Sequence, residues 1–134
     1  MAALDGGKSV DTSMGLTPLE GLIMGTWSGD VDPGVMFLLH QEIGLSIDRI
    51  EDLLNRGSGL LGISGTSNDM RDVIRKAGVG NQRCRLALET FAYRAKKCVG
   101  AYATALGGLD ALAFMAGIGK NSPLVRQMIC ENLE

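Results

Sequence analysis

Residues 82–106 read QRCRLALETFAYRAKKCVGAYATAL, the longest stretch of the chain with a single clear periodicity. Apolar side chains recur in it at intervals of three and four, which is typical of a helix that buries one face. Asn81 before it and Gly107 after it are residue types that begin and end helices. We therefore expect one long helix from about residue 82 to residue 107. Its apolar positions are Leu86, Leu88, Phe91, Ala92, Ala95, Val99, Tyr102, Ala103 and Leu106.

Downstream of this helix, residues 109–116 read LDALAFMA, a nearly continuous apolar run. Its length suits a buried strand of a parallel sheet. A glycine turn is expected at 117–121, and Ser122 and Pro123 then begin a last helix that extends to about Leu133. Strand, turn and helix in this order direct backbone N–H groups toward a phosphate or a sugar. A Gly-x-Gly pair alone is usually only a turn, so the functional interpretation depends on this context.

Upstream, the chain alternates between short helices and loops rich in glycine. Asp32 and Ser46 are good N-caps, and the apolar residues after each recur at helical spacing. Residues 1–12 resemble a hairpin, because Asp5-Gly6-Gly7 is a turn signal between two short strands. The remaining elements expected are an irregular loop at 13–33, helices at 33–44, 46–55 and 69–77, and a glycine-rich loop at 58–68.

These elements amount to at most three strands against five helices. A hairpin and one lone strand cannot make a complete layer by themselves. The fold class predicted is therefore α/β: a helix-rich domain with a short hairpin, one buried strand and part of its sheet absent from this chain.

Composition excludes several classes of protein. The chain has 134 residues, of which 46% are hydrophobic and 21% charged, with a formal net charge of -2. This balance is typical of a folded domain and gives no electrostatic reason to expect nucleic acid or an anionic membrane as a partner. No secretory leader and no apolar run near the ~20 residues of a membrane span is visible, so a cytoplasmic protein is expected.

Residues that bind metals are sparse. The chain has three cysteines, no Cys-x-x-Cys pair and one histidine, His40, which is too few for a zinc site. Glu20, Asp30 and Asp32 are better explained as turn and cap residues than as ligands. No metal site is expected, and the cysteines are expected to be free thiols in a reducing cytosol.

Three segments resemble, in order, the signatures of the acetate/propionate kinase family within the sugar kinase, heat-shock and actin superfamily. Residues 10–26, VDTSMGLTPLEGLIMGT, resemble the family signature around the substrate cleft. Residues 58–71, SGLLGISGTSNDMR, are similar to its adenosine-side segment, and residues 116–122, AGIGKNS, to its second nucleotide motif. The resemblance runs over residues 1–134.

The resemblance implies a fold, an activity and cofactors. The fold is ribonuclease-H-like, of the actin and acetate kinase type, and residues 1–134 correspond to part of its C-terminal, nucleotide-binding domain. Family members transfer the γ-phosphoryl of ATP to acetate or propionate, use Mg²⁺ and work as homodimers. ATP or ADP is therefore the ligand implied, and a second copy of the chain is the partner implied.

The resemblance also implies nucleotide-binding residues. Asp69, Met70 and Arg71 match the family's Asp-Phe-Arg segment beside the adenosine, with methionine replacing phenylalanine. Without the resemblance, Asp69 would be interpreted as an ordinary N-cap and Arg71 as a solvated side chain. Lys120 stands where the family usually has glutamate, which reverses a charge at the site. The residues that match the glycine motif near adenine and ribose are Gly117, Ile118, Gly119 and Asn121.

Trp27 is the most consequential departure from the family pattern. In Gly-Thr-x-Ser-Gly-Asp the family carries an arginine at x, which stabilises the transferring phosphoryl group. An indole offers one neutral N–H donor and no charge. Because phosphoryl transfer depends on positioned cations, Trp27 is expected to be non-functional in that catalytic role.

Two functions are therefore expected from different classes. The first is a truncated relative of a short-chain carboxylate kinase that is inactive alone and retains weak affinity for ATP or ADP. The alternative is a non-enzymatic module that dimerises through the long helix at 82–107 and through exposed sheet edges.

Overall fold

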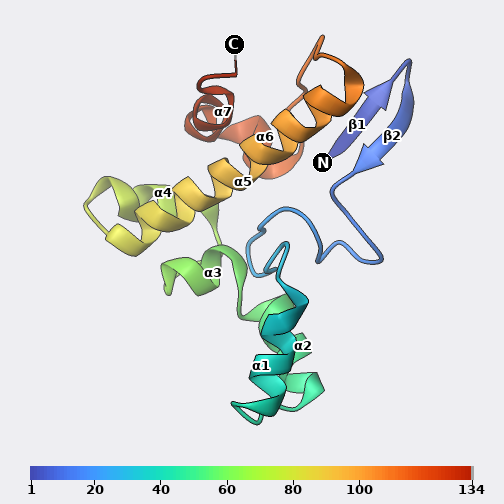
Figure 1. Cartoon of the computed structure of the whole chain (residues 1–134). Helices are drawn as coiled ribbons and strands as arrows, with labels where there is room; N and C mark the ends of the chain where they lie inside the picture. The colour runs from blue at the N-terminus through green and yellow to red at the C-terminus, as the bar shows by residue number, and fades with distance from the viewer. Residues whose placement is uncertain (134) are drawn as a thin grey trace.

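A computed structural model describes residues 1–133 of the chain, in which seven helices follow a two-stranded sheet (Figure 1). The long helix expected at 82–107 is confirmed as α5, which crosses the centre of the molecule. The elements are β1 (Ala2–Asp5), β2 (Lys8–Thr12), α1 (Pro33–Gln41), α2 (Ile47–Arg56), α3 (Gly59–Ser64), α4 (Met70–Gly78), α5 (Gln82–Leu106), α6 (Ala116–Asn121) and α7 (Pro123–Cys130).

Helix α5 forms because both of its ends are capped and one face is small and apolar. The Asn81 side chain accepts a hydrogen bond from the backbone N–H of Cys84 at 2.9 Å, and Gly107 ends the helix in the left-handed conformation. One expected apolar position is wrong, since Leu86 is 55% exposed while the neighbouring Ala87 is fully buried. The buried face consists of Cys84, Ala87, Leu88, Phe91, Ala92, Ala95 and Val99.

The other elements pack around this face of α5. Helices α3, α4 and α7 and strand β1 all contact it. Leu60 of α3, Val73 of α4 and Val125 of α7 are at most 1% exposed within the same core cluster. Burying one such side chain contributes ~1.5–3 kcal/mol, so this single cluster supplies most of the apolar stabilisation.

The N-terminal hairpin is confirmed. Strands β1 and β2 pair antiparallel, with an irregular register between Ala3 and Leu4, and Gly6 and Gly7 form the turn with positive φ. Ala3 is the one residue of the two strands that is buried. Within residues 1–133 the two strands pair only with each other, which leaves both outer edges open.

Two segments expected to be loops are helical instead. Residues 58–68 contain α3, and the expected glycine turn at 117–121 lies within α6. Gly59 begins α3 with φ +63°, and a Cβ there would lie 2.3 Å from the Met24 carbonyl oxygen. The glycine at position 59 is therefore explained by the close approach of two backbone segments. The sequence alone does not distinguish this role of a glycine from a role in a turn.

The buried strand expected at 109–116 is also wrong. Residues 109–115 have no regular structure, and the sheet of the described residues contains β1 and β2 alone. Leu112 and Phe114 pack against the core, whereas Leu109 and Met115 are 46% and 79% exposed. A strand exists only through bonds to a neighbouring strand, and none pairs with this segment in the described part of the chain. The helix-rich fold with a short hairpin is otherwise as predicted.

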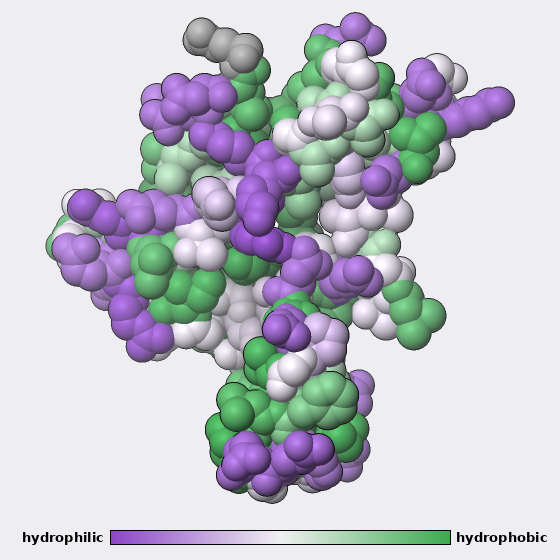
Figure 2. Space-filling model, in the orientation of Figure 1, coloured by the Kyte–Doolittle hydropathy of each residue, from purple (hydrophilic) through white to green (hydrophobic). Residues whose placement is uncertain are grey.

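Helices α1 and α2 project from the rest of the molecule (Figure 1). Their caps are as expected, since Asp32 accepts from Gly34 N at 2.8 Å and Ser46 from Arg49 N at 3.3 Å. No residue of α1 is buried, and Ile50 alone is buried in α2. Figure 2 shows apolar surface over this projecting pair. None of the helices in residues 1–133 could span a membrane.

The first prediction tests the close packing around α5. Ala95→Leu adds volume where the side chain is 4% exposed, and should lower the free energy of unfolding by ~1–3 kcal/mol because the core cannot accommodate it. Ala101→Leu makes the same change at an exposed position of α5 and should shift stability by no more than ~0.5 kcal/mol. Urea unfolding of both variants provides the comparison. Equal effects would show that α5 is not closely packed at residue 95.

Candidate functional site

The loop between β2 and α1 is folded tightly onto itself. Gly21 has φ +96°, and a Cβ there would lie 2.0 Å from the Ser13 carbonyl oxygen. Gly21 N–H donates to Asp30 Oδ1 at 2.8 Å, and Asp30 N–H donates to the Gly21 carbonyl at 3.1 Å. These reciprocal bonds close residues 21–30 into a compact loop that carries Trp27.

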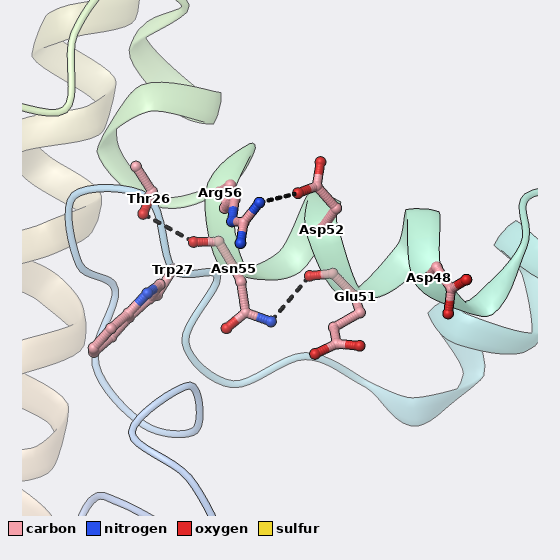
Figure 3. Close-up of a pocket in the computed structure, with 7 residues that line it drawn as sticks. All are labelled: Thr26, Trp27, Asp48, Glu51, Asp52, Asn55 and Arg56. Carbon is pink, nitrogen blue, oxygen red and sulfur yellow. Dashed lines mark hydrogen bonds and ion pairs between the residues drawn. The ribbon is translucent and has the colours of Figure 1, made fainter.

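Backbone bonds fix Trp27 beside the end of α2. Thr26 Oγ1 donates to the Asn55 carbonyl at 2.9 Å, and the Thr26 carbonyl accepts from Ser58 N–H at 3.0 Å (Figure 3). On its other side, Ser28 N–H donates to the Leu54 carbonyl at 3.0 Å. The position of the Trp27 backbone relative to α2 is therefore set by bonds of Thr26 and Ser28, which do not depend on the side chain at residue 27.

The Trp27 side chain lines an open pocket of about 600 Å³. Three carboxylates and one guanidinium of α2 also line this pocket, and that guanidinium, on Arg56, is already paired with Asp52 at 3.3 Å (Figure 3). An excess of negative charge repels a phosphate group. The pocket is lined by Thr26, Trp27, Asp48, Glu51, Asp52, Asn55 and Arg56.

Asp69 and Arg71 lie together at the start of α4. Asp69 accepts from Arg71 N–H at 2.9 Å, so it is the N-cap, and Arg71 Nε donates to Asp69 Oδ1 at 3.0 Å. The hydrogen bond from the Arg71 side chain lowers the pKa of the Asp69 carboxyl. The Arg71 side chain is 90% exposed. Both the cap interpretation and a role at the surface are compatible with this geometry.

The neighbouring Met70 points the other way. It is 4% exposed and belongs to the core cluster around α5. A ligand above the start of α4 would therefore meet little of its side chain.

The glycine motif lies on α6, a helix of six residues. Ala116 begins it with φ +56°, and Arg126 Nη1 donates to the carbonyls of Gly119 and Lys120, both at 2.9 Å. A Cβ on Gly117 would meet no atom within 4 Å, so the backbone at this glycine is open to a ligand. Asn121, at the end of α6, is exposed.

The predicted nucleotide-binding residues fall into two groups, one on α4 and one on α6, and both groups pack on the same hydrophobic core. Met70 belongs to the core cluster, and Ile118 packs against it, so α4 and α6 stand on the same body. No hydrogen bond or ion pair joins the α4 group to the α6 group among residues 1–133. Trp27 lies beside α2 and α3, and its loop approaches the α4 group, since a Cβ on Gly25 would lie 3.1 Å from the Asn68 carbonyl oxygen.

Two features of the site were missed at the level of sequence. Asp48, Asp52 and Arg56 recur at intervals of four, a helical spacing that does place them on one face of α2 and that could have been found. The ion pair between Asp30 and Arg94 joins residues 64 positions apart in the chain, so no local sequence pattern predicts it.

Comparison with known proteins gives consistent matches over the whole chain. The sequence profile of the Acetokinase family matches residues 1–134. The acetate kinase of Heliobacterium modesticaldum is 55% identical over 99% of this chain and 34% of its own length. That of Leifsonia xyli subsp. xyli is 58% identical over 98% of this chain and 33% of its own. The chain thus spans about a third of the length of the curated relatives it matches.

Solved structures agree with the sequence comparison. The crystal structure of Porphyromonas gingivalis acetate kinase superposes with a TM-score of 0.95 at 48% identity, over 98% of this chain and 33% of that one. The crystal structure of a propionate kinase from Francisella tularensis gives a TM-score of 0.92 at 47% identity, over 96% and 33%. The predicted fold class, a partial α/β domain of the acetate kinase type, is therefore confirmed.

A pH dependence follows from the geometry of α4. Hydrogen bonds from Lys76 and Arg75 lower the pKa of Asp72 from 3.8 to about 2. Because the folded-state pKa is the lower one, the stabilisation is complete above pH 3.8 and is lost as the pH falls toward 2. The difference in free energy of unfolding between wild type and Asp72→Asn should shrink over that window. Asp110→Asn, which removes a carboxylate outside any ion pair among residues 1–133, should show no such change.

Proposed function

The chain belongs to the Acetokinase family, and from this premise we propose that residues 1–134 form part of the nucleotide-binding half of a short-chain carboxylate kinase. The reaction proposed is transfer of the γ-phosphoryl of ATP to a carboxylate such as acetate or propionate. The names of the relatives, acetate kinase and propionate kinase, support this substrate class. Three free thiols agree with the proposed location in the reducing cytoplasm.

The observation that carries the proposal further is the place of Trp27. The resemblance implies an arginine at this position, in contact with the transferring phosphoryl group. Here an uncharged indole stands beside three carboxylates, and the one guanidinium in the pocket is engaged with one of them. We infer that residues 1–134 alone do not stabilise the transition state and do not support phosphoryl transfer.

The nucleotide is the ligand that the described residues fit best. The Arg71 guanidinium is exposed although it is paired with Asp69, and the backbone at Gly117 is open where a ligand could approach closely. These groups would bind and orient ATP or ADP. Mg²⁺ fits less well, because no group of three His, Cys, Asp or Glu side chains within residues 1–133 could hold a metal ion.

The role of Trp27 is testable in a full-length setting. The matching third of the Heliobacterium modesticaldum acetate kinase can be exchanged for residues 1–134, which gives a chimera of complete length. Its kcat for acetyl phosphate formation should be low, and Trp27→Arg should raise kcat by about 10³-fold or more, the contribution of an arginine that stabilises a transferring phosphoryl group.

Leu22→Met serves as the control for this chimera, since it is a volume-conserving change outside the pocket. It should leave kcat at the level of the unaltered chimera. If the unaltered chimera, with its tryptophan in place, has the same kcat as the Trp27→Arg variant, then tryptophan at this position does not reduce phosphoryl transfer. The proposal would then be wrong.

Binding of ADP tests the nucleotide half independently of turnover. Gly117→Val adds a side chain that meets no other atom of the chain within 4 Å, so the melting temperature should stay unchanged. The same side chain would occupy the space proposed for the nucleotide, so ADP binding measured by isothermal titration should be abolished. Gly100→Val, at an equally open position of α5, should leave binding intact. Unimpaired binding by Gly117→Val would place the nucleotide elsewhere.

A second candidate function is an interaction module, favoured by the exposed apolar surface of α1 and α2. Phe37 and Leu38 of α1 are 62% and 53% exposed, and Ile43 in the loop after α1 is 60% exposed. A large exposed apolar patch marks an interaction site. The long helix, expected to carry this interface, buries seven side chains in the core and leaves others, such as Tyr93, exposed. A second copy of the chain, packing through α1 and α2, is the partner proposed.

Sedimentation velocity over a wide range of concentrations tests this second candidate. The chain should dimerise, and Phe37→Glu should give a monomer because it places a charge in the apolar contact. Val79→Glu, at an 80% exposed position after α4, should still dimerise. A monomer at every concentration for the unaltered chain would exclude a homodimer formed through α1 and α2.

A further inference from the structure

One ion pair joins the Trp27 loop to the central helix. Arg94 of α5 donates from Nη2 to Asp30 Oδ2, while Asp30 Oδ1 accepts from Gly21 N–H at 2.8 Å. The Arg94 side chain is 24% exposed and that of Asp30 50% exposed. A single carboxylate therefore closes the loop with one oxygen and binds α5 with the other.

This contact has no substitute among the polar contacts of the described residues. Within residues 1–133 it is the only hydrogen bond or ion pair between residues 14–56 and α5. The other bonds of the loop run to α2 and α3, such as Ser28 N–H to the Leu54 carbonyl and Leu60 N–H to the Met24 carbonyl. They fix Trp27 relative to the projecting helices, which bury little themselves. They do not tie the loop directly to α5.

The loop and the projecting helices thus form one unit, and α5 with the elements packed on it forms another. The two units are joined through α3, which contacts α5, and Leu22 of the loop also packs against the core cluster. Apolar packing of this kind is not directional, so an ion pair elsewhere on the loop can fix the orientation of one unit relative to the other. The geometry of Asp30 and Arg94 is suited to that role because it spans the two units.

We propose that Arg94 is a positioning residue: by holding Asp30, it sets where Trp27 and its pocket lie relative to α5. Helix α5 also packs against α4, and Asp69 and Arg71 lie at the start of α4. The ion pair therefore fixes the distance between Trp27 and these two predicted nucleotide-binding residues. Its relevance to phosphoryl transfer rests on the proposed function. The positioning itself does not, and it can be measured without substrate.

Trp27 is the only tryptophan of the chain, so its fluorescence reports on this loop alone. Arg94→Met keeps helix propensity and removes the charge. It should shift the Trp27 emission to the red and raise its acrylamide quenching constant by about twofold or more, as expected when a partly exposed ion pair is lost. Arg94→Lys should restore part of the wild-type signal. Arg85→Met, an exposed arginine of α5 outside any ion pair among residues 1–133, should change nothing.

A second variant guards against a merely structural effect. Asp30→Asn keeps an oxygen for Gly21 N–H and removes only the charge, so it should reproduce the Arg94→Met spectrum while far-ultraviolet circular dichroism stays native. High salt should move the wild-type signal toward that of the variants and leave the variants unchanged. Wild-type emission and quenching in both Arg94→Met and Asp30→Asn would overturn the proposal, because backbone bonds alone would then position the loop. Kinase activity does not enter either outcome.

Discussion

Close packing against the small apolar face of α5 is the constraint on which the rest of the structure depends. Three alanines, Ala87, Ala92 and Ala95, lie in that face and let neighbouring elements approach closely. Helices α3, α4 and α7 bury apolar residues there, and strand β1 contacts α5 as well. Removing α5 would therefore expose the apolar residues that α3, α4 and α7 bury against it.

This dependence explains which elements could be predicted from the sequence. Helix α5 and its Asn81 cap were predictable, because the sequence signals for both are local. The residues of α5 that are buried in the core recur at the helical spacing that the sequence shows. The segment at 109–115 was not, because its apolar pattern predicts a strand whereas strand formation needs a neighbour that the described residues do not provide. Helix α3 was missed because the close approach of Gly59 to Met24 is a contact between distant residues.

The candidate site divides in the same way. The identities of Trp27, Asp69 and Gly117 could be singled out from motifs. A local bond holds Asp69, whereas Trp27 is held by the bond of Thr26 to Asn55, 29 residues away. What the motifs could not show is the surrounding charge: Asp48 and Asp52 lie more than twenty residues beyond Trp27, yet line the same pocket. The ion pair of Asp30 with Arg94 is likewise a product of the fold. Sequence thus identified the groups, and tertiary structure decided their electrostatic environment.

The central claim is that an indole beside an acidic pocket cannot replace a positioned cation in phosphoryl transfer. The most direct test is an acetyl phosphate assay on the purified chain of 134 residues, supplied with ATP, Mg²⁺ and acetate or propionate. The account predicts no product above the level without protein. Sustained turnover at a rate comparable with that of a full-length acetate kinase would contradict it.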